Sequence, residues 1–249
     1  MSIPIDLSEK TALITGATRG IGRAIANEFI EAGANVLLTG TSQSKIDQLA
    51  AGEKDPKVKW LPADFSSSDG IASFIQQLNS TDTIDICVNN AGINIIKSYE
   101  EYSADEYQRL MSINLMAPFR ITQQLVLGMK KRGFGRIVNI ASIWSEISKP
   151  GRLLYSTSKT GLVGFTRSMA VEYAVDNILV NSVSPGFTLT ELTKQSLSND
   201  EMKSLSSQVP MERFAEPNEI AKTVLFLCSD LNTYITGQNI TIDGGFTLV

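Results

Sequence analysis

The sequence contains no histidine and only two cysteines among its 249 residues. Without histidine a Ser-His-Asp triad is excluded, and without a Cys/His cluster there is no basis for a zinc site, so we expect no metal. Cys87 and Cys228 each stand in a short apolar run, which indicates small buried side chains in a reducing compartment rather than a structural disulfide. Proton transfer must therefore use tyrosine, lysine, serine or carboxylate groups.

The sequence also lacks an excess of basic residues, a long apolar run and a flexible linker. Its net charge of -4 argues against nucleic acid or an anionic membrane as a partner. No apolar run approaches the roughly 18 residues of a membrane span, and the N-terminal residues do not resemble a secretory signal. We expect a soluble cytoplasmic protein, and we expect residues 1–249 to form one domain.

Short β-branched runs alternate with amphipathic helical stretches almost to the end of the chain. This alternation is typical of repeated βαβ units. It predicts an α/β fold of the Rossmann type, with a doubly wound parallel sheet of about seven strands and helices on both faces. The expected strands are 11–16, 34–40, 58–64, 84–90, 135–142, 177–186 and 237–245.

A glycine-rich turn follows the first expected strand and opens the first expected helix. Gly16, Gly20 and Gly22 would let the backbone approach a pyrophosphate, whose charge the helix N-terminus would meet. The alternative is a tight turn with no ligand. Because a strand precedes the turn and a helix and second strand follow it, we favour dinucleotide binding.

The second expected strand ends at Thr39-Gly40-Thr41-Ser42, where a fold that selects NAD usually carries an acid for the ribose 2′-hydroxyl. The segment has no acid. Thr41 and Ser42 could bind a 2′-phosphate by hydrogen bonds, with the charge of Arg19 beside them, which predicts NADP(H). The alternative for Arg19 is a solvated loop cation.

Polar residues stand where later strands end, at the edge at which ligands bind in open α/β sheets. Asp64 is placed to accept a hydrogen bond from an adenine amine, or else to cap its turn. The Asn89-Asn90-Ala91-Gly92 turn is expected to hold the cofactor cleft together. Ser142 ends the fifth strand, and Pro185-Gly186 could lie along a nicotinamide ring.

Two longer segments have less regular patterns. The helix expected over about 103–127 carries Asn114, with Pro118 four residues later, and both disfavour a regular helix interior. We expect a local distortion there that could hold a water for proton relay. Residues 187–211 are rich in threonine and serine and are the candidate lid over a substrate.

Tyr155 and Lys159 lie four residues apart in an expected helix that runs on through Gly164 and Met169, so both would face one site. Using a tyrosine near neutral pH requires its pKa to fall by roughly 3 units, or about 4 kcal/mol. A cation ~4 Å away at an effective dielectric of about 20 supplies about 4 kcal/mol. By itself so short and common a pattern favours the alternative, a half-buried Tyr and a solvated Lys.

Taken together, these motifs resemble the short-chain dehydrogenase/reductase family over essentially the whole chain. The matching motifs are TGATRGIG at 15–22, NNAG at 89–92, Asn114, Ser142, YSTSK at 155–159 and PG at 185–186. Within that family the sequence is most similar to the 3-oxoacyl-[acyl-carrier-protein] reductases, in TGATRGIG, in GTS after the second strand and in the closing YITGQNITIDGG.

The resemblance implies a catalytic set for carbonyl reduction. Tyr155 would be the general acid, Ser142 would hold the carbonyl oxygen, Lys159 would lower the tyrosine pKa and bind the nicotinamide ribose, and Asn114 would hold the relay water. The pro-S hydride would be transferred, and the protein would be a homotetramer built from paired helices and C-terminal strands. Cofactor contacts are expected from Gly16, Thr18, Arg19, Gly20, Ile21, Gly22, Thr41, Ser42, Asp64, Phe65, Asn90, Ala91, Gly92, Tyr155, Lys159, Pro185, Gly186 and Thr188.

Two features depart from the acyl-carrier-protein reductases. Lys130, Lys131 and Arg132 could meet an acidic carrier protein, but Glu172 and Asp176 stand where a basic residue is expected and would repel it. The loop between Ser142 and Tyr155 contains an aromatic residue and two charged ones, which favours a polar substrate; the alternative is a surface ion pair between Glu146 and Arg152. Substrate contacts are expected from Ser142, Trp144, Glu146, Arg152, Tyr155 and Phe187.

Three functions remain open from the sequence. The first is NADP(H)-dependent reduction of a ketone, foremost a 3-oxoacyl thioester, with acyl carrier protein as a possible partner. The second is oxidation or reduction of a sugar, polyol or other small polar carbonyl compound. The third is a non-catalytic dinucleotide-binding redox sensor, against which the complete Asn, Ser, Tyr and Lys set argues.

Overall fold

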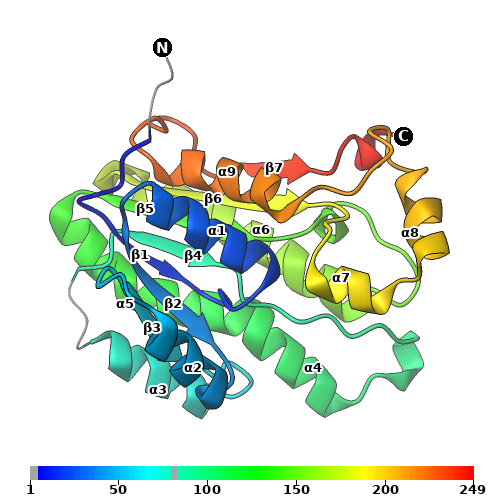
Figure 1. Cartoon of the computed structure of the whole chain (residues 1–249), viewed down its shortest axis with the longest axis horizontal. Helices are drawn as coiled ribbons and strands as arrows, with labels where there is room; N and C mark the ends of the chain where they lie inside the picture. The colour runs from blue at the N-terminus through cyan, green and yellow to red at the C-terminus, as the bar shows by residue number, and fades with distance from the viewer. Residues whose placement is uncertain (1–4, 80–82) are drawn as a thin grey trace.

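The structure is a computed structural model, and it describes residues 5–79 and 83–249. Within these residues, parallel strands form a seven-stranded sheet with the order β3-β2-β1-β4-β5-β6-β7 (Figure 1). The strands are β1 (Thr11–Ile14), β2 (Asn35–Gly40), β3 (Val58–Pro62), β4 (Ile86–Asn89), β5 (Gly135–Ile140), β6 (Ile178–Pro185) and β7 (Asn239–Ile242). The prediction of a doubly wound parallel sheet of about seven strands is confirmed.

Helices cover both faces of the sheet, and each face has its own apolar core. Phe29 of α1 and Val224 of α9 are fully buried in one core, whereas Phe74 of α3 and Ile121 of α5 are buried in the other. The longer helices are α1 (Gly20–Glu31), α2 (Gln43–Gly52), α3 (Ser68–Leu78), α4 (Ala104–Met111), α5 (Ala117–Arg132), α6 (Leu153–Tyr173), α8 (Asn199–Ser206) and α9 (Pro217–Cys228). The expected helices on both faces are therefore present.

The strand order places a ligand crevice at the centre of the sheet. Strand β1 pairs with β2 on one side and with β4 on the other, so the chain changes direction across the sheet at β1 and β4. In open parallel sheets the carboxyl ends of the strands at such a switch point form the ligand site. The glycine-rich turn after β1 and the Asn turn after β4 both lie at this edge.

The segment between α4 and α5 is a π-helix, η2 (Ser112–Met116), with Asn114 at its centre. A π-helix widens the turn by one residue, which is a common feature of functional sites. Pro118 lies in the first turn of α5, where a missing N–H costs little. The distortion expected near Asn114 is confirmed.

Residues 187–211, the candidate lid, contain the short helix α7 (Glu191–Ser196) and α8. Both helices lie at the same end of the molecule as the C-terminus in Figure 1, in yellow and orange. Cys87 and Cys228 are buried and free, as expected from their apolar surroundings. None of the helices in the described part of the chain combines the length and hydrophobicity that a membrane span requires.

Candidate active site

The turn after β1 has the backbone geometry of an anion-binding loop. Gly16 and Gly20 have φ angles of +67° and +56°, in the left-handed region that favours glycine. At Gly22 a Cβ would lie 2.3 Å from the Gly16 carbonyl oxygen, so no side chain fits there. Arg19, the N-cap of α1, makes no side-chain cap bond, so its own side chain does not use the N–H groups of the first helical turn.

The Asn turn after β4 holds this glycine loop in place. The Asn90 side-chain amide donates to the carbonyl oxygens of Thr15 at 2.9 Å and Gly16 at 3.1 Å. The Thr15 hydroxyl accepts from the backbone N–H groups of Asn90 and Ala91. The expectation that this turn holds the cleft together is confirmed, because four hydrogen bonds join the two loops.

A cavity of about 520 Å³ opens over both loops. It contains most of the residues expected to bind the cofactor, namely Gly16, Thr18, Arg19, Gly20, Ile21, Gly22, Thr41, Asp64, Phe65, Asn90, Ala91 and Gly92. Its wall also includes residues that the sequence reading missed, namely Gly40, Ser66, Ile93, Arg109, Ile113, Thr190 and Glu191. Gly40 was missed although it stands in the segment already singled out; the others lie outside the recognised motifs or beside them.

Besides Tyr155 and Lys159, four expected cofactor residues lie outside this cavity, and Asp64 has a second local role; the four are Ser42, Pro185, Gly186 and Thr188. Ser42 caps α2, where its hydroxyl accepts from the Lys45 N–H. Asp64 lines the cavity but also accepts from the Ser66 N–H at 2.9 Å, so its carboxylate caps its own turn. Gly186 follows β6 and donates its N–H to the Ile242 carbonyl oxygen, which fixes the PG turn against β7.

A carboxylate of the candidate lid reaches the glycine loop. Glu191 begins α7, and its side chain accepts a hydrogen bond from the Gly20 N–H at 3.1 Å. Gly20 is the first residue of α1, so this carboxylate binds at the helix N-terminus where a pyrophosphate is expected. A pyrophosphate at this position would compete with Glu191 for the same N–H.

We therefore expect Glu191→Gln to bind NADPH about 3- to 10-fold more tightly than the wild type, because removing a negative charge at a helix N-terminus is worth about 1 kcal/mol. Titration of the cofactor by fluorescence would measure the change. Glu172→Gln, a charge-matched change on α6, is the control and should leave the affinity unaltered. Weaker binding by the Glu191 variant would show that the carboxylate helps to hold the cofactor.

The four expected catalytic residues come from three elements at the carboxyl edge of the sheet. Ser142 follows β5 and is the N-cap of a 3-10 turn, η3 (Ile143–Ser145). Tyr155 and Lys159 lie in the first two turns of α6, and the Lys159 Nζ is 5.7 Å from the centre of the tyrosine ring. Asn114 lies in the π-helix. Ser142, Lys159 and Asn114 are buried.

The surroundings of Tyr155 act on its pKa in opposite directions. Burial raises the pKa of Tyr155, whereas a hydrogen bond with the Ser142 side chain and the positive charge of Arg152 lower it. The net shift is upward, which differs from the lowered pKa expected from the sequence, because burial outweighs both. The Ser142 side chain nevertheless lowers the tyrosine pKa, so the two side chains share one small site, while the Ser142 hydroxyl accepts a hydrogen bond from the Trp144 N–H at 3.3 Å.

Lys159 is a buried cation next to a fixed acceptor. Burial lowers its pKa from 10.5 to about 8. Its Nζ donates to the Ile140 carbonyl oxygen at 2.7 Å, at the end of β5. A Cβ at Gly92 would lie 3.5 Å from this Nζ and 3.4 Å from the Asn114 Oδ1, so the NNAG turn packs directly against both groups.

The Asn114 side chain clamps the chain after β4. Its Nδ2 donates to the Ile93 carbonyl oxygen and to the Ser158 hydroxyl, and its Oδ1 accepts from the Ile93 N–H. These bonds use both Nδ2 hydrogens and one of the two Oδ1 lone pairs. A relay water at this position has as possible partners the second Oδ1 lone pair and the main chain of the π-helix, where the i to i+4 ladder is interrupted.

Beyond Ser142 and Tyr155, the expected substrate residues lie in separate surroundings. Trp144 is buried, and the Arg152 guanidinium carbon lies 5.4 Å from the centre of its ring. The suggested Glu146–Arg152 ion pair is wrong, because the Glu146 carboxylate accepts instead from Asn239 and Thr241 of β7. Phe187 stacks on Phe214 at 5.3 Å and packs edge-on against Phe246.

Two of the three cations at the end of α5 are already engaged. Lys130 forms an ion pair with Asp176 at 3.2 Å, and Arg132 forms one with Asp85 at 3.3 Å. Arg132 also donates to the Ile84 carbonyl oxygen. Asp176 therefore neutralises one of the cations expected to meet a carrier protein, which weakens the basic surface available for docking.

Comparison with known proteins agrees with this geometry. A family model described as Enoyl-(Acyl carrier protein) reductase matches residues 16–247. The 3-oxoacyl-[acyl-carrier-protein] reductase FabG of Aquifex aeolicus is 41% identical, covering 97% of this chain and 98% of the relative. A gluconate 5-dehydrogenase of Burkholderia cenocepacia, solved with NADP and tartrate, has a TM-score of 0.91 at 29% identity, covering 99% of this chain and 98% of that one.

A further solved structure, described as a short chain dehydrogenase/reductase family protein, has a TM-score of 0.88 at 34% identity and covers 98% of this chain and 100% of that one. The chain belongs to the short-chain dehydrogenase/reductase family. It is an oxidoreductase of that family, as the sequence motifs predict.

Proposed function

We propose that this chain reduces a ketone to a secondary alcohol with NADPH, and runs the reverse reaction with NADP. The observation that carries the proposal is that Ser142, Tyr155 and Lys159 meet at the carboxyl edge of β5, beside the NNAG turn that also lines the nucleotide-sized cavity. A pure redox sensor would not need this serine and tyrosine beside a buried lysine.

When bound, the cofactor supplies the hydride. The Ser142 hydroxyl donates a hydrogen bond to the substrate carbonyl oxygen, and Tyr155 delivers a proton to that oxygen as negative charge develops on it. Lys159 binds the nicotinamide ribose and, as a cation, stabilises the tyrosinate that remains. Main-chain groups of the π-helix hold the water through which the proton is replaced.

NADP(H) is favoured over NAD(H) by the residues around the end of β2. Arg19, Thr18 and Thr41 line the cavity there, and the segment after β2 carries no carboxylate to bind a 2′-hydroxyl. Structural neighbours of this chain were solved with NADP, which supports the same choice. Arg109 adds a second cation to the cavity wall.

Replacing Arg19 with alanine is expected to lower kcat/KM for NADPH by about 10- to 100-fold, because a charged hydrogen bond to a phosphate contributes roughly 1.5–3 kcal/mol. The value for NADH should fall less than about 3-fold, since NADH lacks the phosphate. Steady-state kinetics with both cofactors would measure this. Equal losses with the two cofactors would mean that Arg19 does not bind the 2′-phosphate.

Two substrate classes compete. Relatives such as the Aquifex FabG favour a 3-oxoacyl thioester, and with it acyl carrier protein as a partner. The loop between Ser142 and Tyr155, with Trp144 and Arg152, favours a small polar carbonyl compound, in line with the gluconate 5-dehydrogenase neighbour. The pairing of Lys130 with Asp176 and of Arg132 with Asp85 counts against docking of an acidic carrier.

The deciding experiment measures cofactor oxidation by purified protein, with NADPH and NADH, against acetoacetyl thioester and a panel of keto sugars. Turnover of the thioester would support the acyl reductase, and turnover of polar ketones only would support the second class. Failure of every ketone, with the cofactor still bound, would overturn the proposed reduction.

We further propose a homotetramer in the cytoplasm, with residues 187–211 acting as the lid. Exposed apolar side chains support self-association: Leu127, Val171 and Val175 on the helical face, and Tyr234, Leu248 and Val249 beside the edge strand β7. The two free buried cysteines suit a reducing compartment. Light scattering would test the mass, and a monomer would refute the assembly.

A further inference from the structure

Two cations lie on the same indole ring beside the proposed catalytic tyrosine. The Lys149 Nζ is 5.2 Å and the Arg152 guanidinium carbon is 5.4 Å from the centre of the Trp144 ring. Burial lowers the pKa of Lys149, and the charge of Arg152 lowers it further. The two like charges are therefore close enough to repel each other, and a bound anion would relieve that repulsion.

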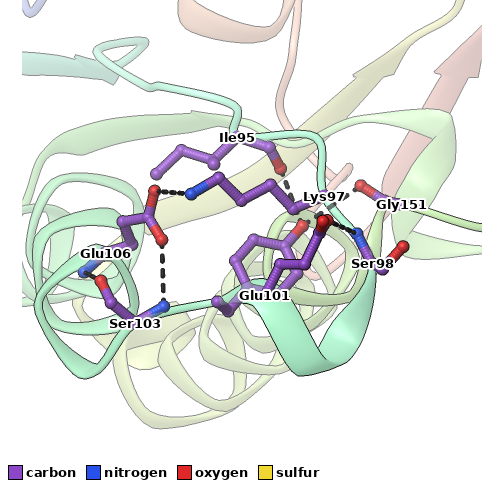
Figure 2. A network of polar contacts seen from close by, with 8 residues as sticks. Ile95, Lys97, Ser98, Glu101, Ser103, Glu106 and Gly151 are labelled. Atoms are coloured by element: carbon purple, nitrogen blue, oxygen red, sulfur yellow. Dashed lines mark hydrogen bonds and ion pairs between the residues drawn. The ribbon is translucent and has the colours of Figure 1, made fainter.

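Three of the four neighbouring carboxylates have other partners. Glu146 accepts from Asn239 and Thr241. Figure 2 shows that Glu106 pairs with Lys97 and that Glu101 accepts from the Ser98 N–H. Glu100 lines the same cavity as Lys149 without an ion pair between them. Within residues 5–79 and 83–249, the ion pairs include neither Lys149 nor Arg152.

The guanidinium of Arg152 has a buried N–H donor without a hydrogen-bond partner within the part of the chain that the structure describes. Its Nε is buried and has no hydrogen-bond partner among the described residues, and burial lowers the pKa of the group. An Nε–H with the adjacent Nη–H forms the edge that binds a carboxylate through two parallel hydrogen bonds. A buried donor of this kind is costly unless a ligand meets it.

The position of Arg152 is defined by the chain around it. Arg152 is the N-cap of α6 and follows Gly151. The Tyr102 hydroxyl lies 3.2 Å from the Gly151 carbonyl oxygen and 2.9 Å from the Ile95 carbonyl oxygen; Figure 2 shows both carbonyl groups. The charge of Arg152 lowers the pKa of Tyr155. Arg152 stands three residues before Tyr155 at the start of α6, so an anion held by Arg152 would lie on the side of the helix that carries Tyr155.

We propose that Arg152 and Lys149 bind a carboxylate of the substrate, and that the natural substrate is a small polar keto acid or the corresponding hydroxy acid. The inference rests on the proposed ketone reduction at Tyr155 and specifies its substrate class. A 3-oxoacyl thioester has no anionic group near its ketone, because the phosphate of its carrier lies at the far end of the pantetheine arm. Trp144 forms the apolar surface between the two cations.

A matched pair of ketones tests the inference. 5-Keto-D-gluconate and L-sorbose have the same six-carbon chain, with a carboxylate in the first where the second has a hydroxymethyl group. We expect the wild type to favour the acid by at least about 100-fold in kcat/KM, as a site built for a polar group rejects the analogue that lacks it. In Arg152→Met the ratio should fall below about 5, and Lys149→Met should lower it about 10-fold.

The ratio separates recognition from catalysis, because the loss of Arg152 also alters the pKa of Tyr155 and slows both ketones alike. Lys54→Met, which removes an exposed cation after α2, is the charge-matched control and should keep the wild-type ratio. Equal losses for the two ketones in Arg152→Met, or a wild type without preference for the acid, would overturn the inference.

A binding measurement keeps the test independent of turnover. With NADP present, D-gluconate should produce a saturable change in tryptophan fluorescence that sorbitol does not. The change should vanish in Trp144→Phe, which retains Trp60, and in Arg152→Met. No gluconate-specific change would refute the carboxylate site even if ketones are reduced. Gluconate binding without turnover of any ketone would refute the proposed reduction alone.

Discussion

Replacing Tyr155 with phenylalanine is expected to lower kcat for ketone reduction by about 10³-fold, within the range that positioned general acids contribute. The change removes only the hydroxyl that is proposed to deliver the proton and whose pKa the Ser142 side chain lowers. The aromatic ring remains, so NADPH affinity should change less than about 3-fold, since surface and packing contacts of the ring are retained. Single-turnover kinetics and a cofactor titration would measure the two effects.

Tyr107→Phe is the matched control, because Tyr107 lies exposed on α4 and its hydroxyl has no part in the proposed reaction. It should keep wild-type kcat. Unchanged turnover in Tyr155→Phe would refute the assignment of the general acid, and loss of cofactor binding along with turnover would show that the variant had lost its fold or its cleft.

Replacing Lys159 with methionine is expected to stabilise the protein at pH 7 while lowering kcat by at least about 10²-fold, as losing a group that supports acid catalysis does. Lys159 is 3% exposed, and burial lowers its pKa from 10.5 to about 8. That difference amounts to roughly 3 kcal/mol of destabilisation when the amine is charged. The lost hydrogen bond to Ile140 offsets about 1 kcal/mol, which leaves a gain of about 2 kcal/mol.

The stability difference between the wild type and Lys159→Met changes with pH. Below pH 8 the lysine is charged in both states, so the full cost of burying the charge is present. Between about pH 8 and 10.5 the folded chain releases the proton and the unfolded chain keeps it, so wild-type stability rises with pH relative to the variant. Above about pH 10.5 both amines are neutral, and the variant should be the less stable by the lost hydrogen bond.

Urea unfolding of both proteins at several pH values would measure this difference, and subtracting the two curves cancels the titration of shared groups. Lys131→Met is the control, because Lys131 is exposed and its removal should change the unfolding free energy by less than about 0.5 kcal/mol. A constant difference between wild type and Lys159→Met across pH 7–10.5 would contradict the lowered lysine pKa.

Much of the fold follows from local rules that the sequence expresses directly. Gly16 and Gly20 occupy left-handed φ values that few other residues adopt, so the turn after β1 was readable from composition and spacing. Asn114 and Pro118 disfavour a regular helix interior, and the chain forms a π-helix there. The β-branched segments predicted the strands, because a strand in a parallel sheet is buried on both faces and is therefore apolar on both.

Contacts between side chains far apart in the chain could not be predicted from the sequence. Glu191 bonds to Gly20 across 171 positions, and Glu146 bonds to β7 instead of to nearby Arg152. Arg109 reaches the cofactor cavity only because α4 packs beside it. The raised pKa of Tyr155 likewise results from burial, which the spacing of residues along the sequence does not predict.

The sequence by itself therefore determined the order of strands and helices, the glycine turn and the Ser, Tyr and Lys set, because backbone preference and short-range periodicity act within a few residues. Only the tertiary structure decided which charges are paired, which are buried and which face the site. Those outcomes depend on distances and desolvation between segments that meet after folding, which is why Glu146 bonds to β7 and the buried Arg152 Nε has no hydrogen-bond partner among the described residues.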